Sequence, residues 1–334
     1  MKILVTGGSG MLGSAILRMF HQQHELHFTA RNTVIAKQLA EQFDVIPHLV
    51  DLRDHSAVHA VCQGHAVCQG MDAIIHCAAL SSPWGKWQAF YQANVDATKN
   101  LVNAANTHQI SRFIHISSTS VYFDHQDRWN IRETDAIASH WCNDYAHTKY
   151  LSELEAIKGQ SKAIILRPRG IFGPNDRAII PRVLKAIKNN TLLLPSGRNP
   201  VVDLTYVDNV AHAAMLACTQ ADRLQHGDVF NISNNEPMPI ETVLQALCVG
   251  LNLKVTLQSL PYGVVSPLLK LSEQIRRRLP HQPEPRLTSY SAGLFNYHQT
   301  LDISKAIKNL NYQPLFSIQE GIQQYANWSK NKNL

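Results

Sequence analysis

Residues 2–13 read KILVTGGSGMLG, in which a short apolar run is followed by glycines at Gly7, Gly10 and Gly13. The next stretch, Met11–Phe20, repeats its apolar residues at helical spacing. Glycines between a strand and a helix permit a tight turn, close approach of the backbone to a pyrophosphate, and close packing of helix on strand. The start of the helix adds N–H groups and the positive end of a dipole. The segment therefore predicts a dinucleotide-binding loop.

Strand and helix signals alternate along the rest of the first half. We expect strands at Leu26–Ala30, Val45–Leu49, Ala73–Cys77, Phe113–Ile116 and Ile164–Arg167, and a helix around Val95–Ala105. Such alternation predicts an α/β fold, a doubly wound parallel Rossmann sheet with helices on both faces. The dinucleotide domain should comprise residues 1–168 and about 201–233, with 201–207 and 229–232 returning to the sheet. Residues from about 169 to 200 and 234 to 334 should form a smaller, interleaved substrate-binding region.

The choice between NAD and NADP depends on the end of the second strand. An Asp or Glu there would accept from the ribose hydroxyls of NAD, but the chain has Arg31-Asn32. An arginine can pair with the 2′-phosphate of NADP. The alternative is a solvated arginine at a strand end. We expect NADP to be preferred, with NAD as the other possibility.

Two later segments carry the groups that could do chemistry. Ser117 to Ser120 follow a strand, at the edge where open α/β sheets place their ligands. Tyr145 and Lys149, in YAHTK, are four residues apart and share one face of the predicted helix. A nearby ammonium should lower the phenol pKa, so that Tyr145 could exchange a proton with a carbonyl oxygen during hydride transfer. A serine hydroxyl would orient the same oxygen.

The motifs TGGSGMLG, DLRD, HCAA, ISSTSVY, YAHTK and LRPRGIFGP resemble those of the extended short-chain dehydrogenases/reductases over nearly the whole length. The resemblance implies that Ser118, Tyr145 and Lys149 are catalytic and that Asn94 helps to order the site; the alternative for Asn94 is a helix N-cap. The implied dinucleotide contacts are Gly7, Gly10, Met11, Leu12, Gly13, Arg31, Asp51, Leu52, Ala78, Ala79, Tyr145, Lys149 and Pro168. The same resemblance suggests a homodimer.

Within that family the chain is most similar to the 3β-hydroxysteroid dehydrogenase branch, which includes bacterial 2-alkyl-3-oxoalkanoate reductases. Sugar-nucleotide epimerases usually carry a diphosphate-binding arginine where this chain has Val202, and an apolar side chain cannot bind a diphosphate. The resemblance therefore favours an oxidoreductase that interconverts a secondary alcohol and a ketone on an apolar, steroid-like or acyl substrate. The alternatives are a sugar-nucleotide epimerase or dehydratase, and a non-catalytic dinucleotide sensor.

Two segments stand apart from this chemistry. His59–Gly70, HAVCQGHAVCQG, repeats one hexamer, and its His and Cys residues raise the question of zinc. Known Cys/His zinc sites use longer loops between ligand pairs, so we expect a surface insertion and no metal. Residues 264–279 place Val264, Leu268, Leu271, Ile275 and Leu279 at helical spacing. Such a stripe usually packs on its own protein, and a weak membrane-surface contact is the alternative.

The composition bounds the remaining possibilities. The formal net charge is +6 in 334 residues and the longest basic run is Arg276–Arg278, which does not indicate nucleic acid. Six cysteines in a chain of this length suit a reducing compartment. The N-terminus enters a strand at once, without the pattern of a signal peptide. We expect a cytoplasmic protein.

Overall fold

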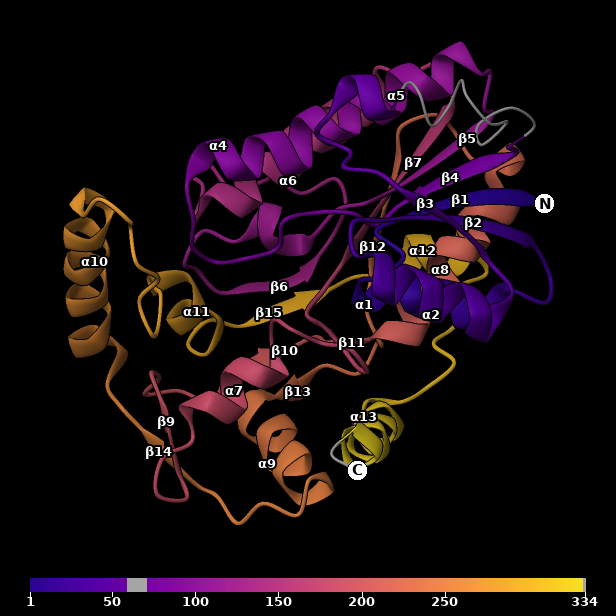
Figure 1. Ribbon diagram of the computed structural model, residues 1–334. Coiled ribbons are helices and arrows are strands. Elements are labelled where there is room, and N and C mark those ends of the chain that lie inside the picture. The colour runs from indigo at the N-terminus through magenta and orange to yellow at the C-terminus, as the bar shows by residue number, and fades with distance from the viewer. Residues whose placement is uncertain (59–70, 333–334) are drawn as a thin grey trace.

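The computed structural model describes residues 1–58 and 71–332. The repeated hexamer at residues 59–70, for which we expect a surface insertion without metal, lies outside the described residues. A seven-stranded parallel sheet forms the centre, in the order β12-β7-β5-β4-β1-β2-β3 (Figure 1). Its strands are β1 (Lys2–Thr6), β2 (Glu25–Ala30), β3 (Ile46–Leu49), β4 (Ala73–His76), β5 (Arg112–Ile116), β7 (Lys162–Pro168) and β12 (Asp228–Ile232). The doubly wound fold predicted from the sequence is confirmed.

Two hydrophobic cores lie on opposite faces of this sheet, because successive strand residues point to opposite sides. In β1, Ile3 and Val5 belong to one core and Leu4 to the other. The first core is covered by α1 (Met11–Phe20), α2 (Thr33–Phe43), α8 (Val207–Thr219) and α12 (Ser304–Leu310). The second is covered by α5 (Ala97–Thr107) and α6 (Asp144–Ile157). The central strands are therefore largely apolar, as expected of strands buried on both faces, and His76, His115 and Arg167 are among their buried polar exceptions.

A smaller region of mixed sheet completes the molecule. Its four strands, in the order β13-β10-β15-β6, are β6 (Arg128–Ile131), β10 (Val201–Val202), β13 (Met238–Pro239) and β15 (Gln299–Leu301). Two further pairs are β8 (Ile171–Phe172) with β11 (Thr205–Tyr206), and β9 (Thr191–Leu194) with β14 (Thr256–Ser259). The accompanying helices are α4 (Trp87–Phe90), α7 (Ile180–Ala186), α9 (Ile240–Gly250), α10 (Tyr262–Arg278), α11 (Ser289–Leu294) and α13 (Ile318–Lys332).

Three expectations about local structure need correction. Residues 201–207 do not join the large sheet: β10 pairs with β13 and β15, and β11 pairs with β8, so only β12 returns to it. The helix expected around 95–105 is preceded by a π-helix, Tyr91–Asp96, before α5 begins. The apolar stripe of α10 does not pack on its own protein, because all five of its side chains are exposed.

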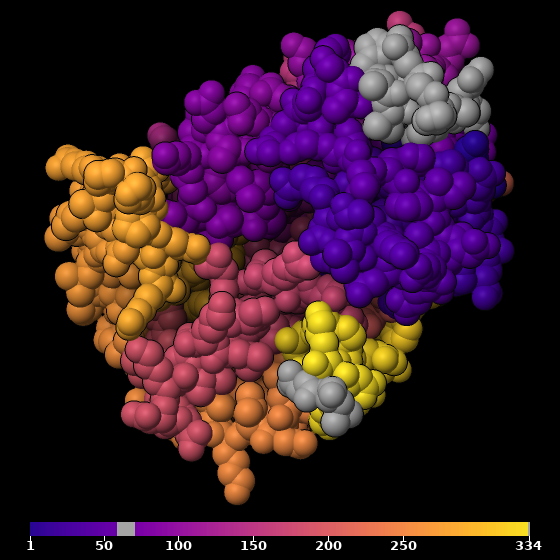
Figure 2. All heavy atoms as spheres, in the orientation of Figure 1, coloured from indigo at the N-terminus to yellow at the C-terminus, as the bar shows by residue number. Residues whose placement is uncertain are grey.

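The chain order brings the segments of interest to one edge. In parallel strands the carboxyl ends meet at the same edge of the sheet, and ligands bind there. The loops after β1, β4, β5 and β7 all leave that edge, and the start of α6 lies beside the turn after β5. The space-filling view shows a hollow between the indigo and purple N-terminal half and the later, pink segments (Figure 2).

Candidate active site

The loop after β1 has the geometry that its glycines predict. Gly7 has φ +67°, and a Cβ there would lie 2.9 Å from Cα of Ala78. A Cβ on Gly13 would lie 2.3 Å from the carbonyl oxygen of Gly7, so the first turn of α1 packs directly on the loop. Gly10 is the N-cap of α1 and no side chain caps the helix. The N–H groups around Met11, Leu12 and Gly13 therefore fit a bound phosphate.

The remaining expected dinucleotide contacts follow neighbouring strands. Asp51 and Leu52 come after β3, Ala78 and Ala79 after β4, and Pro168 ends β7. Thr6 ties two of these loops together, because its hydroxyl contacts Nδ1 of His76 at 2.7 Å and accepts from N–H of Ala78.

The region around Arg31 contains a second cation that sequence reasoning missed. Arg53 forms a two-pronged ion pair with Asp51, with Nη2 2.5 Å from Oδ2 and Nε 2.9 Å from Oδ1. Arg53, and more weakly Arg31, lower the pKa of the Asp51 carboxyl. Arg31 is exposed and stands at the end of β2. The Asp51 carboxylate is thus paired with Arg53, and Arg31 adds a second, weaker positive charge nearby.

The structure brings Ser118 and Tyr145 into contact. Ser118 is the N-cap of the short 3₁₀ turn Thr119–Tyr122, and its Oγ accepts from N–H of Ser120 at 3.1 Å. The Tyr145 hydroxyl lies close to Ser118 and to Ser81, and both serines lower its pKa. The sequence analysis did not identify Ser81, which lies on the loop after β4. Its position could have been a signal, because a polar residue that follows a strand of this sheet lies at the edge where ligands bind.

Helix α6 holds Tyr145 and Lys149 at fixed positions. Asn143 caps the helix, since its side chain accepts from N–H of Ala146 at 2.8 Å. Tyr145 therefore stands in the first turn and Lys149 one turn further on. The Lys149 side chain is buried, and its Nζ lies 3.3 Å from Nε2 of His115, a residue of β5.

Asn94 positions the site and does not cap a helix, which corrects that alternative. It lies inside the π-helix, an element common at functional sites. Its Oδ1 accepts from N–H of Leu80 at 2.7 Å, while its Nδ2 donates to Oγ1 of Thr148 at 3.0 Å. Asn94 thus connects the loop that bears Ser81 to the helix that bears Tyr145.

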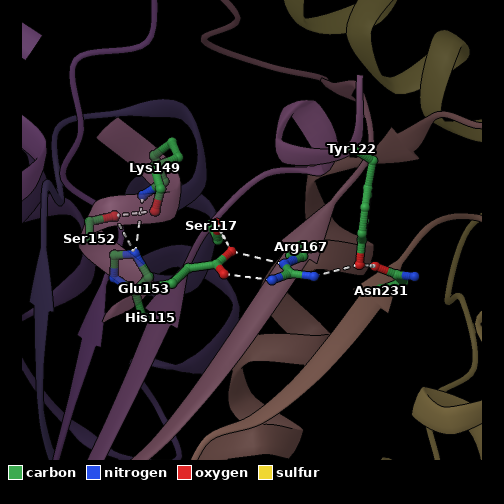
Figure 3. A network of polar contacts seen from close by, with 8 residues as sticks. All are labelled: His115, Ser117, Tyr122, Lys149, Ser152, Glu153, Arg167 and Asn231. Atoms are coloured by element: carbon green, nitrogen blue, oxygen red, sulfur yellow. Dashed lines mark hydrogen bonds and ion pairs between the residues drawn. The ribbon is translucent and has the colours of Figure 1, made fainter. Parts of the chain in front are cut away.

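A buried polar network behind Lys149 fixes the back of the site (Figure 3). Glu153, one turn after Lys149 on α6, pairs with Arg167 of β7 at 2.6 Å and accepts from Ser117. Arg167 donates to the Tyr122 hydroxyl at 2.6 Å, which in turn donates to Oδ1 of Asn231 at 3.0 Å. The network joins the segment after β5 to α6, β7 and β12. Its further hydrogen bonds help to compensate the cost of removing the Glu153–Arg167 ion pair from water.

The electrostatics of Tyr145 differ from the expectation. Burial raises the pKa of Tyr145, and the hydrogen bonds with Ser118 and Ser81 oppose that rise. The groups that lower the pKa of Tyr145 are the two serines rather than Lys149, whose Nζ lies 3.3 Å from Nε2 of His115. Burial lowers the pKa of Lys149 to about 8, against the opposing influence of Glu153 and Cys77.

Arg169 is a further site-side residue that the sequence analysis did not single out. It follows Pro168 directly, and only 7% of it is exposed. Within the part of the chain that the structure describes, its guanidinium donates no hydrogen bond, and its electrostatic neighbours are Tyr290 and Asp203. Arg169 and Tyr145 both influence the pKa of the Tyr290 phenol, so the three side chains lie in the same region.

The arrangement suits proton exchange at a carbonyl oxygen beside a bound dinucleotide. Tyr145 presents a phenol, Ser118 and Ser81 lie beside its hydroxyl, and Lys149 is a buried cation on the same helix. Among residues 1–58 and 71–332, no group of three His, Cys, Asp or Glu side chains is placed to hold a metal ion.

Comparisons with known proteins agree with this geometry. Residues 3–233 match the model of the family described as "NAD dependent epimerase/dehydratase family". The chain is 35% identical to the Escherichia coli (strain K12) protein named "Uncharacterized protein YbjS", covering 98% of this chain and 97% of that one. It is 31% identical to the 2-alkyl-3-oxoalkanoate reductase of Shewanella oneidensis, over 76% and 69% of the two chains. It is 30% identical to the human decarboxylating sterol-4-alpha-carboxylate 3-dehydrogenase, over 96% and 86%.

Solved structures share the fold at lower identity. UDP-glucuronic acid 4-epimerase from Bacillus cereus, in complex with NAD, superposes with a TM-score of 0.76 at 20% identity. The match covers 99% of this chain and 97% of the epimerase. At this identity the likeness establishes the fold alone.

Proposed function

Since the chain belongs to the NAD dependent epimerase/dehydratase family, we propose that it is an NADP(H)-preferring oxidoreductase that interconverts a secondary alcohol and a ketone at carbon 3 of an apolar substrate. The observation that carries this proposal is the proximity of Ser118 to the Tyr145 hydroxyl, with Lys149 one turn along α6. A dinucleotide bound at the glycine loop would supply or accept the hydride.

Each residue of the pair has a role that its surroundings support. Because burial raises the pKa of Tyr145, its hydroxyl is protonated at neutral pH and can donate to a carbonyl oxygen. Ser118 would hold the same oxygen, so that charge developing on it meets a placed donor. Lys149 would contact the ribose and help to return the tyrosine to its protonated form.

The substrate we propose is a 3-oxo or 3-hydroxy acid whose carboxylate is attached next to the reacting carbon. Two relatives are named for such molecules: a 2-alkyl-3-oxoalkanoate, and a sterol 4-carboxylate oxidised at carbon 3. In both, the carboxyl group is bonded to a neighbour of carbon 3. An apolar body with one adjacent carboxylate also agrees with Val202, which cannot bind a diphosphate.

Arg169 is the residue we propose for that carboxylate. It is buried and has no hydrogen-bonded partner within the described residues, and a buried guanidinium gains most from a carboxylate that accepts two bonds. Arg169 and Tyr145 both influence the pKa of the Tyr290 phenol, which supports the proposal that a molecule held by Arg169 places its neighbouring carbon near the Tyr145 hydroxyl.

A substrate panel tests the proposal. NADPH oxidation is followed by absorbance with a 2-alkyl-3-oxo acid, with a matched ketone that lacks the carboxyl group, and with UDP-glucose. We expect turnover that is fastest with the 3-oxo acid. Turnover of UDP-glucose with cofactor retained on the protein, and none with the acid, would replace the proposal by a sugar-nucleotide epimerase.

A further inference from the structure

Helix α10 presents its apolar residues to solvent. Val264, Leu268, Leu271, Ile275 and Leu279, here called the outer stripe, have exposed fractions of 64%, 63%, 55%, 53% and 45%. Figure 1 shows α10 at the left edge of the molecule, with α11 beside it on one side only. An exposed apolar patch of this kind marks an interaction surface more often than a single exposed leucine does.

The opposite side of α10 is attached to the protein by polar contacts. The Glu273 carboxylate accepts from N–H and Oγ of Ser289 at 2.6 and 2.8 Å. Arg277 lies 3.5 Å from Asp144 and 4.8 Å above the ring of Trp84. At about 100° per residue, Glu273 and Arg277 lie opposite the outer stripe. The polar face of α10 therefore meets the protein and its apolar face meets solvent, the opposite of a helix packed on a core. Turning the apolar face toward the protein would break the bonds of Glu273 and Arg277.

The charge around the outer stripe is positive. Of the four cations of α10, Arg276 and Arg278 flank the outer stripe, whereas Lys270 and Arg277 lie toward the opposite side of the helix. The single acid of the helix, Glu273, is also on that opposite side, where its carboxylate is bonded to Ser289. Arg276 lines an open groove of about 400 Å³ together with Leu268, Leu271 and Ile275 of the stripe. The surface thus combines an apolar stripe with basic side chains at its margins.

We propose that the outer stripe of α10 docks on the surface of an anionic phospholipid bilayer. Helices with an apolar face and basic margins lie in the plane of the interface, where apolar burial and attraction to anionic lipid act together. Among the described residues, no helix is long and apolar enough to cross a membrane, so the contact is with the surface. Figure 2 shows this segment at the rim of the molecule, where a flat partner can reach it.

Charge decides between a bilayer and a second copy of the chain. Two copies of α10 facing each other would bring basic margins together, and like charges across an interface disfavour association. An anionic lipid surface provides the opposite charge along the whole helix. The docking surface goes beyond the proposed function, because it uses none of the residues that would bind cofactor or substrate.

The test is co-sedimentation of the full chain with vesicles, with and without phosphatidylglycerol in a phosphatidylcholine background. We expect binding to the anionic vesicles that weakens with added salt. The variant Leu268→Gln/Leu271→Gln/Ile275→Gln should bind at least about tenfold more weakly, since it removes apolar area that would enter the interface. Arg276→Gln/Arg278→Gln should lose the preference for anionic lipid. Val34→Gln/Val249→Gln, which alters exposed apolar residues on α2 and α9, is the matched control.

Two results would overturn the proposal. One is that neither vesicle type binds the wild-type chain while circular dichroism shows it folded. The other is a lower mass for the triple glutamine variant than for the wild type in sedimentation velocity without lipid, which would assign the stripe to a second copy. Because turnover of a soluble substrate is measured separately, failure of vesicle binding and failure of the proposed reaction are distinguishable.

Discussion

Lys149 and His115 are hydrogen-bond partners, with Nζ of the lysine 3.3 Å from Nε2 of the histidine. Burial lowers the pKa of His115 well below its ordinary value, so the ring is neutral and Nε2 can accept from the ammonium. The same Nε2 lies 2.9 Å from Oγ of Ser152, so the ammonium and a hydroxyl share this nitrogen, while Nδ1 has no hydrogen-bond partner among the described residues. The hydrogen bond from Lys149 to His115 is long. A ribose hydroxyl of a bound dinucleotide could therefore replace His115 as the partner of the ammonium.

This relationship leads to a pH dependence of cofactor binding. Burial lowers the pKa of Lys149 to about 8, so the side chain is charged below that pH and loses its proton above it. If the ammonium contacts the dinucleotide, Kd for NADPH should be flat below pH 8 and rise by up to about tenfold per pH unit above it. Fluorescence titration of the wild type and of Lys149→Arg, which stays charged, measures this. Parallel curves for the two proteins would show that Lys149 does not contact the cofactor.

Replacement of Tyr145 by Phe should abolish turnover. It removes the hydroxyl that donates the proton, and general acid catalysis contributes about 10²- to 10⁴-fold. NADPH affinity and the unfolding temperature should change little, because the ring remains. Tyr150→Phe on the same helix is the matched control and should keep wild-type turnover. Activity of Tyr145→Phe within a factor of two of the wild type would contradict the assigned role.

Arg169 should determine the preference for acids. Replacing it with Gln removes a charge-assisted pair that contributes about 1.5–3 kcal/mol, so kcat/KM for the 3-oxo acid should fall by roughly ten- to a hundredfold. The matched ketone has no carboxylate to pair with Arg169, so its kcat/KM should not change. Arg169→Lys should restore part of the activity, since lysine keeps the charge without the planar fork. An equal loss with both substrates would make Arg169 a structural residue.

The fold and the centre of the site could be predicted because they depend on local patterns. The glycines before Met11 and the apolar strands require this topology, and the four-residue spacing of Tyr145 and Lys149 fixes their common helical face. The contact between Ser118 and Tyr145 follows from strand ends meeting at one edge. These features need no knowledge of distant side-chain packing.

What escaped prediction depends on packing between distant segments. Ser81 lies near Tyr145 in a loop that Asn94 connects to α6. Arg53 affects the cofactor region through its ion pair with Asp51, which depends on the positions of the two side chains. The direction in which α10 turns its apolar stripe was also missed. Helical periodicity identifies an amphipathic helix but cannot tell which face meets the protein, and here the polar bonds of Glu273 and Arg277 decide it.

Arg31 and Arg53 together allow a test of the NADP preference. Arg53 is committed to Asp51, so we expect Arg31 to pair with the 2′-phosphate and to favour NADPH over NADH by roughly ten- to a hundredfold. Arg31→Asp should narrow or invert that ratio, because a carboxylate repels the phosphate and accepts from a ribose hydroxyl. Arg53→Gln should act differently. It leaves the Asp51 carboxylate without its partner, so Asp51 could accept from a ribose hydroxyl and NADH should bind more tightly. NADPH should still bind, because Arg31 is unchanged and can pair with its 2′-phosphate. Titration of each variant with both cofactors, repeated at high salt, separates the two arginines. Equal affinity of the wild type for NADPH and NADH would make Arg31 a solvated arginine at a strand end.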